Sequence, residues 1–239
     1  MRVNFLMSTK DPVGITIKKL GYKFDEIEDD VIDFRYDKGD VIVIFSRHES
    51  SSKTPSLTVH YPGNPGSNAF GGEPFKLGIA FPKLLSSIFR EILTLPVDIQ
   101  KAIEATHHGP TYQTHPVIFV EIGSDINYWQ NENLVKMMVE ATLRGVDKFD
   151  QTVCEEIIAG VGGTHYTPYF SKISTSKCIG HVVSKYYLNE INQEVVRQVI
   201  MNSVEKVDKI IFDNVNSSIK NKIIEYIKWI NSNIKLESR

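Results

Sequence analysis

Six of the seven histidines lie in or beside short polar segments that follow apolar runs of the sequence. The six are His48, His60, His107, His108, His165 and His181. Imidazole is the side chain best suited to proton transfer near neutral pH, and it is also the commonest metal ligand. If these side chains converge, we expect either general acid–base catalysis or a zinc-like site, and the spacing of the residues leaves both open.

Two carboxylates, Glu104 and Glu121, lie close to these histidines inside segments that otherwise read as buried strand. Buried acids are rare unless they are paired or bound to a metal. Each could be a general base, a metal ligand, or the acceptor that orients a ligating imidazole. Alternatively, each could pair with a nearby arginine or lysine, or be exposed at a strand end. We favour a functional role for both.

The neighbouring residues His107 and His108 would point to opposite faces of an extended segment. A turn at Gly109 and Pro110 would bring both rings toward one pocket, and we expect such a turn. Only one of the two imidazoles would otherwise enter a given site.

Three glycines, Gly160, Gly162 and Gly163, precede the residues Thr164, His165 and Tyr166. Such a loop can approach a ligand closely and offer backbone amides to a phosphate or an oxyanion. The GVGG sequence matches neither the dinucleotide-binding fingerprint nor the phosphate-binding loop, so hydride transfer and nucleotide hydrolysis have little support. GxSxG and HExxH are also absent from the sequence.

Tyrosines accompany the same polar segments and could stack on a base or another ring. Alternatively, any one of them could simply line a half-buried wall. The four tyrosines are Tyr61, Tyr112, Tyr166 and Tyr186.

Strand and helix patterns alternate along the chain, which predicts an α/β fold, a three-layer α/β/α sandwich with a mostly parallel or mixed sheet. We expect a helix after Asp11 that ends at Gly21, and a hairpin or two closely spaced strands around the DKGD turn. The predicted strands are 3–7, 31–36, 41–45, 57–60, 99–105, 117–122, 156–159 and 209–212, and the further helices are 84–93, 131–144, 194–204 and 217–230. The polar segments 47–49, 60–64, 106–110 and 162–168 follow strands, so we expect them along one edge of the sheet.

Length and composition favour one compact domain over residues 1–239. The chain is 41% hydrophobic and 23% charged, with no linker-like tract. A net charge of −2 is unlike that of a protein that coats nucleic acid through phosphate contacts alone. No apolar run reaches the ~18 residues of a membrane helix and the start is unlike a secretory signal, so we expect a cytoplasmic protein without membrane contact.

The two cysteines, Cys154 and Cys178, fit no CxxC pattern and are too few for a disulfide framework. We expect both to be reduced. A bound metal would then need ligands from histidine, aspartate or glutamate.

Several motifs in order resemble the archaeal and plant type of D-aminoacyl-tRNA deacylase. They are SLTVHYPGN (56–64), EATHHGPT (104–111), FVEIG (119–123), GVGGTHYTP (160–168) and the pair Gly180 and His181. The resemblance covers nearly the whole chain and thins over the last part, where KIIFDNVNSS (209–218) departs from the family pattern.

This resemblance implies hydrolysis of the ester that joins a D-amino acid, such as D-tyrosine, to the terminal adenosine of tRNA, a chiral proofreading activity. It also implies a zinc-dependent monomer with no obligate protein partner. The fold would be close to that of bacterial peptidyl-tRNA hydrolase and the nucleoside phosphorylases. The acceptor end of D-aminoacyl-tRNA would enter the crevice at the strand ends.

Ester hydrolysis needs an activated water and a site for the developing oxyanion. The candidate catalytic residues are Glu104, His107, His108 and His165. The candidate zinc ligands are His48, His108, Glu121 and His165. The candidate substrate-binding residues are His60, Asn64, Thr106, Gly162, Gly163, Thr164, Tyr166 and His181.

Two other functions fit the same residues. A zinc-dependent peptidase or amidase on a related α/β fold would use the same histidines and carboxylates, and it would cleave a peptide or amide without RNA. A non-catalytic tRNA-binding module would keep tRNA affinity after His108→Ala, although the near-neutral charge argues against it.

Overall fold

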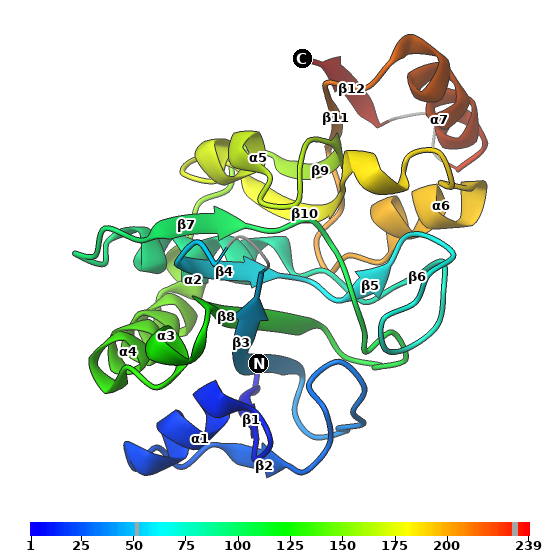
Figure 1. The fold of residues 1–239 in the computed structure, drawn as a ribbon. Helices are drawn as coiled ribbons and strands as arrows, with labels where there is room; N and C mark the ends of the chain where they lie inside the picture. The colour runs from blue at the N-terminus through cyan, green and yellow to red at the C-terminus, as the bar shows by residue number, and fades with distance from the viewer. Residues whose placement is uncertain (51–52, 231–233) are drawn as a thin grey trace.

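A computed structural model describes residues 1–50, 53–230 and 234–239 (Figure 1). Strands and helices alternate through the first half as β1 (Val3–Ser8), α1 (Pro12–Lys19), β2 (Asp25–Ile27), β3 (Val41–Glu49), β4 (Ser56–His60), β5 (Gly63–Asn64), β6 (Lys76–Leu77), α2 (Pro82–Leu93), β7 (Gln100–Ile103) and β8 (Val117–Ser124). The second half contains α3 (Ile126–Trp129), α4 (Glu132–Asp147), η1 (Phe149–Gln151), β9 (Ile157–Gly162), α5 (Pro168–Ile173), β10 (Cys178–Val183), η2 (Lys185–Tyr187), α6 (Gln193–Met201), β11 (Lys209–Asp213), α7 (Ser217–Ile230) and β12 (Lys235–Ser238).

The strands form two main sheets. The larger has the order β2-β1-β3-β8-β4-β7 and is parallel except where β4 runs antiparallel to β8. The smaller has the order β10-β9-β11-β12 and is parallel throughout. The segment after β7 joins them, because the Thr106 N–H donates to the carbonyl of Val182 at 2.8 Å. The expected α/β architecture, a mostly parallel sheet flanked by helices, is confirmed.

Helices cover the two sheets unequally (Figure 1). The helices α1, α2 and α4 contribute to one hydrophobic core that also includes side chains of both sheets. On the opposite side, α6 and α7 pack on the smaller sheet. Within the described parts of the chain, no helix covers the corresponding face of the larger sheet, and residues such as Val31 and Phe34 of the β2–β3 connection cover part of it. This helix-free face is where the functional side chains lie.

The prediction of a hairpin or two closely spaced strands around DKGD is wrong. Residues 31–36 form no strand, and β3 pairs instead with β1 and β8, which leaves no free edge beside it. The apolar residues of that segment, Val31 and Phe34, are buried against the sheet face, which explains their strand-like composition. The predicted helices 84–93, 131–144, 194–204 and 217–230 correspond to α2, α4, α6 and α7.

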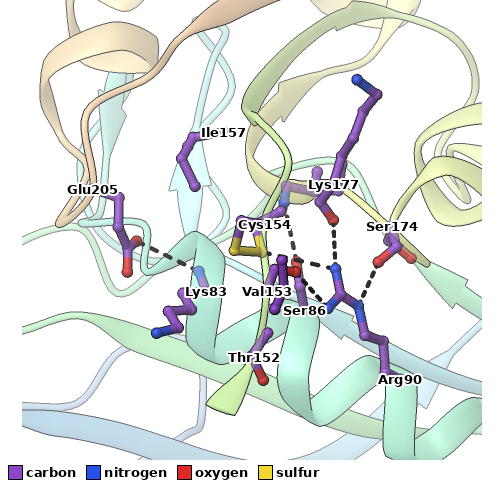
Figure 2. The surroundings of a disulfide bond; sticks show 12 residues. Lys83, Ser86, Arg90, Thr152, Val153, Cys154, Ile157, Ser174, Lys177 and Glu205 are labelled. Carbon is purple, nitrogen blue, oxygen red and sulfur yellow. Dashed lines mark hydrogen bonds between the residues drawn. A yellow bond between two sulfur atoms is a disulfide. The ribbon is translucent and has the colours of Figure 1, made fainter. Parts of the chain in front are cut away.

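The cysteines form a disulfide, so the expectation that both are reduced is wrong. Cys154 lies just before β9 and Cys178 begins the neighbouring parallel strand β10, which brings their Cα atoms to 5.2 Å. Figure 2 shows the side chain of Arg90 beside this bond, where it donates to the carbonyls of Val153, Ser174 and Lys177. The disulfide and Arg90 together fix the base of the β9–β10 connection.

Among the described residues, no helix combines the length and apolar character needed to cross a membrane.

Candidate active site

Five segments bring their functional side chains together on the helix-free face of the larger sheet. The pairing register of the strands and the alternation of side chains place three residues on this face, His48 of β3, His60 of β4 and Glu121 of β8. Glu121 lies between its two cross-strand partners, Ser46 of β3 and Thr58 of β4, and His48 and His60 lie two residues further along those strands. Further side chains come from the segments after β7 and β9, and they are Glu104, His107, His108 and His165. The expectation of a site along one sheet edge is therefore wrong, because β4 runs antiparallel to β8 and ends at His60 opposite Phe119, near the start of β8.

Glu104 is the centre of one half of this cluster. Its carboxylate oxygens lie 3.1 Å from Nδ1 of His48, 2.8 Å from Nε2 of His165 and 3.5 Å from Nε2 of His107. The side chain of Glu104 is fully buried, whereas 37% of the His165 side chain is exposed. His165 is therefore the cluster member through which solvent or a substrate reaches Glu104.

Glu121 is the centre of the other half. It accepts a hydrogen bond from Ser46 Oγ at 2.9 Å and lies 3.3 Å from Nδ1 of His48. Nε2 of His60 is 3.5 Å from the carboxylate, and Nε2 of His108 is 3.8 Å from it. His48 thus contacts both acids and joins the two halves.

The turn expected at Gly109 is present, and it aims both neighbouring imidazoles into the cluster. His108 adopts a left-handed backbone conformation with φ of 41°. The rings of His107 and His108 are 4.5 Å apart and meet edge to face. A Cβ at Gly109 would approach the carbonyl oxygen of Ile32 to 2.4 Å, so only glycine fits this turn.

Backbone carbonyls fix the tautomers of three cluster histidines. Nδ1 of His60, His107 and His108 lies 3.1, 2.9 and 2.6 Å from the carbonyls of Tyr61, Ala105 and Gly109. A carbonyl only accepts, so Nδ1 carries the hydrogen in each ring. In the neutral rings, Nε2 then presents a lone pair toward a carboxylate. Two facing lone pairs repel, and a proton or a metal ion between them removes that repulsion.

The carboxylates dominate the electrostatics. Burial alone would lower the pKa of His48, but the hydrogen bond to Glu121 and the charge of Glu104 raise it to about 9. Burial raises the pKa of Glu104, yet contact with His165 and the charge of His48 outweigh this and hold the pKa below its usual value. For His107, burial and the neighbouring imidazoles lower the pKa well below its ordinary value. The cluster therefore combines ionised acids with at least one neutral imidazole.

The residues present fit a metal ion. Both oxygens of Glu104 and Nε2 of His60 are buried without a hydrogen bond of good geometry. Two ligand sets have their donor atoms within 4.8 Å of one another, namely His60, Glu104, His107 and Glu121, and His48, Glu104 and His165. Nitrogen and carboxylate donors of this kind are typical of zinc. His60, predicted to bind substrate, thus lies among the possible ligands.

Other predicted substrate-binding residues lie behind the cluster. Thr106 and His181 are buried and contact each other, Oγ1 to Nδ1, at 2.9 Å, and Nε2 of His181 lies 3.1 Å from the carbonyl of Gly78. Burial lowers the pKa of His181 to about 4, so this ring is neutral. Both residues hold the segment after β7 in place from behind, next to the smaller sheet.

The glycine turn shapes the site but does not provide the predicted oxyanion amide at Gly163. The Gly163 N–H already donates to the carbonyl of Asp213 at 3.0 Å. Gly162 and Gly163 both have positive φ, and a Cβ at Gly162 would come within 2.1 Å of the Asp213 oxygen. The close approach of β11 therefore requires these glycines. Beyond them, Thr164 is exposed on the turn.

Tyr166 contacts a cluster member directly. Its hydroxyl lies 2.9 Å from Nε2 of His48, the nitrogen that faces away from the carboxylates. With its pKa raised to about 9, the ring is protonated near neutral pH, so Nε2–H donates to this hydroxyl and Nδ1–H faces the acids. Tyr166 thus supports the orientation of His48.

Two hollows open beside His48 and His165. The first, of about 240 Å³, is lined by Val31, Ile32 and Phe70 together with cluster residues, and we name it the Phe70 hollow. The second, of about 490 Å³, is lined by Thr164, Tyr166 and Tyr186 together with His48 and His165, and we name it the Tyr186 hollow.

Sequence reasoning missed two residues around these hollows. Arg47 lies on the wall of the Phe70 hollow, where its guanidinium pairs with the buried Asp11 at 3.0 Å. Phe70 is an exposed phenyl ring in the loop between β5 and β6. A signal for Phe70 was present, since the long Gly- and Pro-rich loop at 61–78 is of the kind that often carries function.

Known proteins resemble the chain over its whole length. A D-aminoacyl-tRNA deacylase of Sulfurisphaera tokodaii is 61% identical over 235 residues, which cover 98% of this chain and 99% of that protein. A protein of the same name from Saccharolobus solfataricus is 54% identical over 239 residues and covers 100% of both chains. One from Saccharolobus islandicus is 54% identical over 236 residues, 99% of this chain and 100% of the other.

The fold also matches a crystal structure of a conserved protein of unknown function. The TM-score is 0.85 at 26% identity, and the match covers 99% of this chain and 94% of the other. A sequence model of the family described as D-aminoacyl-tRNA deacylase matches residues 35–235. That range contains every segment that contributes a histidine or a glutamate to the cluster, and the chain belongs to the D-aminoacyl-tRNA deacylase family.

Proposed function

We propose that the chain hydrolyses the ester between a D-amino acid and the 3′-terminal adenosine of tRNA. Water adds to the ester carbonyl carbon, the bond to the ribose oxygen breaks, and that oxygen takes up a proton. The products are tRNA and the free D-amino acid. The observation that carries this proposal is the cluster of Glu104 and Glu121 with their histidines, lying open to solvent at His165 in a chain of this family.

The cluster also supports a zinc ion, because buried carboxylate oxygens and a bare imidazole nitrogen converge with no other partner of good geometry. Either His60, Glu104, His107 and Glu121, or His48, Glu104 and His165, would hold it. His108 is a further candidate ligand, because its Nε2 faces Glu121 at 3.8 Å. When bound, zinc would polarise an ester carbonyl and lower the pKa of a water toward about 7.

With a zinc ion held by His60, Glu104, His107 and Glu121, His165 stays free of metal, and His165 and Glu104 act as the acid–base pair. His165 Nε2 lies 2.8 Å from Glu104 Oε2, so a proton that His165 takes from water is stabilised by the adjacent carboxylate. A carboxylate that stabilises an imidazolium is a recurring device of hydrolases. The same imidazolium can then return the proton to the ribose oxygen as it leaves.

The acceptor end of tRNA is the expected partner, and a monomer acting in the cytoplasm, where tRNA is charged, fits this role. The disulfide bears on that location, because such bonds are rare in cytosolic proteins outside hyperthermophiles. The peptidase or amidase alternative gains no support from the family match.

The first experiment compares release of D-tyrosine from D-Tyr-tRNA with release of L-tyrosine from L-Tyr-tRNA. The protein is stripped with a chelator, its metal content is measured, and zinc is then restored. We expect cleavage of the D-ester only, loss of the rate on stripping, and recovery with zinc. As a matched control, His115→Ala changes a histidine that lies outside the cluster and should leave the rate unchanged.

Each part of the proposal can fail separately. An unchanged D-ester rate in protein shown to be free of metal would overturn the zinc assignment but keep the deacylase. Equal cleavage of both esters would overturn chiral selection. No cleavage of either ester by zinc-loaded protein would overturn the proposed function.

A further inference from the structure

The two hollows meet at His48, Glu49 and His165, which line both of them. An ester likewise has two sides, the acyl group and the alcohol, that extend in different directions from the reacting carbon. We infer that the Phe70 hollow takes the D-aminoacyl group and that the Tyr186 hollow takes the terminal adenosine. This assignment rests on the proposed function, and it names the residues that read each half of the substrate.

Phe70 has an exposed ring, and hydrogen bonds hold the backbone of its loop in place. Its side chain is 68% exposed, although the surrounding loop is tightly bonded. The Phe70 N–H donates to Asn64 Oδ1 at 3.2 Å, and Asn64 Nδ2 donates to the carbonyl of Gly71 at 2.6 Å. On the other side, the Gly109 N–H donates to the Phe70 carbonyl at 2.8 Å. The loop is thereby tied to the turn that follows His108, and Asn64 acts as a positioning residue.

The chemistry of the Phe70 hollow suits an amino acid better than a nucleotide. Val31, Ile32 and Phe70 provide an apolar wall for a side chain, and Asp30 adds a carboxylate that lines this hollow and not the other, while the guanidinium of Arg47 on the same wall is paired with Asp11. The α-amino group of an aminoacyl ester is cationic in its protonated form, so carboxylates attract it and repel a phosphate. The hollow is also the smaller of the two.

The Tyr186 hollow suits the end of an RNA strand. Tyr186 is 64% exposed, and the ammonium of Lys185 lies 5.5 Å from the centre of its ring. An exposed aromatic ring beside a cation is the combination that binds a stacked base together with its phosphate. The Lys185 N–H donates to the carbonyl of Gly163 at 2.9 Å, which fixes this platform to the turn that carries His165.

The test uses two variants of the full-length protein and two substrates. We expect Tyr186→Ala to lower kcat/KM roughly tenfold for D-Tyr-tRNA and D-Ala-tRNA alike, because every substrate has the same terminal adenosine. Phe70→Ala should lower kcat/KM roughly tenfold for D-Tyr-tRNA and at most about twofold for D-Ala-tRNA, whose side chain is too short to reach the ring. Both losses should be mainly in KM.

Adenosine monophosphate provides a readout that needs no ester. It should bind the wild-type protein and compete with substrate, and Tyr186→Ala should weaken its binding roughly tenfold while Phe70→Ala leaves it unchanged. Tyr186→Phe keeps the ring and should restore both binding and turnover. Trp229→Ala, which removes an exposed ring on α7, is the matched control and should change neither.

The assignment would be overturned if Tyr186→Ala impaired D-Tyr-tRNA alone while Phe70→Ala impaired both substrates. Equal effects of Phe70→Ala on both substrates, or no effect of either variant, would also overturn it. If the wild-type protein cleaves neither D-ester, the proposed function fails instead. Binding of adenosine monophosphate that depends on Tyr186 would in that case still support the nucleoside half of the inference.

Discussion

Each of the two sheets carries a cluster of acidic and basic side chains, and different basic groups neutralise the carboxylate charge in the two clusters. On the smaller sheet, the half-buried Glu156 lies between the ammonium groups of Lys177 and Lys209. Hydrogen bonds from Lys177 and Lys209 lower the pKa of Glu156 to about 2. On the larger sheet, the ionisable side chains that face Glu104 and Glu121 are imidazoles, and Glu121 also accepts a hydrogen bond from Ser46 Oγ.

This difference distinguishes a cluster that stabilises the fold from a cluster whose groups can take part in a reaction. A lysine keeps its charge at every pH at which the protein works, so Glu156 stays ionised and paired. An imidazole releases a proton near neutral pH or binds a metal, so the charge around Glu104 can change during a reaction. Removing each carboxylate should therefore affect a different property of the protein.

The largest effect is expected from Glu104→Gln. The amide keeps the size of the side chain but removes the charge that stabilises protonated His165. We expect kcat for D-Tyr-tRNA to fall by about 10²- to 10⁴-fold, the range of general acid–base contributions. Single-turnover hydrolysis measures it. A loss of less than tenfold would contradict the acid–base role of Glu104, and Glu156→Gln should retain the wild-type kcat.

A smaller effect, on stability, is expected from removal of the disulfide. The bond joins residues 24 positions apart and closes the segment that contains β9, the His165 turn and α5. A loop of this length corresponds to about 3 kcal/mol in the chain-entropy view. Denaturant unfolding of Cys154→Ser should show that loss, and wild-type protein in reductant should show the same. Equal stability of the oxidised and reduced wild type would contradict the prediction.

The smallest effect is expected from Glu156→Gln, and it depends on pH. The folded-state pKa of about 2 lies below the ordinary value of 4.5, so the ion pairs stabilise the fold fully above about pH 5.5 and lose this contribution as the pH falls toward 2. After allowance for solvent screening, we expect the variant to lose about 1 kcal/mol at pH 7. The stability difference from wild type should shrink steadily below pH 5, and a difference independent of pH would contradict the ion-pair origin.

Local patterns predicted most helices and central strands, but not how the strands pair. The apolar run at 41–45 correctly predicted a strand, and the structure buries both faces of that part of β3. The same reasoning failed at residues 31–36, because apolar residues that cover a sheet resemble residues within one. The antiparallel pairing of β4 with β8 is a long-range choice that no local pattern specifies. Such pairing is set by tertiary packing.

The chemical types in the site were predictable, whereas the individual roles were not. Glu104, Glu121 and the histidines could be identified because they are polar residues in strand-like segments. Burying such groups costs free energy unless they are paired, so their presence there indicates a function. His60 and His181 have similar sequence surroundings, yet one lies in the cluster and the other behind it. Arg47 was missed because a strand-end arginine carries no distinctive local signal, and Phe70 was missed because its long loop indicates function without showing which residue carries it.

Because the site is completed by contact between the two sheets, catalytic activity should appear late in folding. His165 is held near Glu104 partly because the Ala105 N–H donates to the His165 carbonyl at 2.8 Å, across the junction of the two sheets. Each sheet could acquire its secondary structure alone, but the acid–base pair exists only after both have docked. During refolding, enzyme activity should therefore return after the circular dichroism signal, as expected when distant contacts form last.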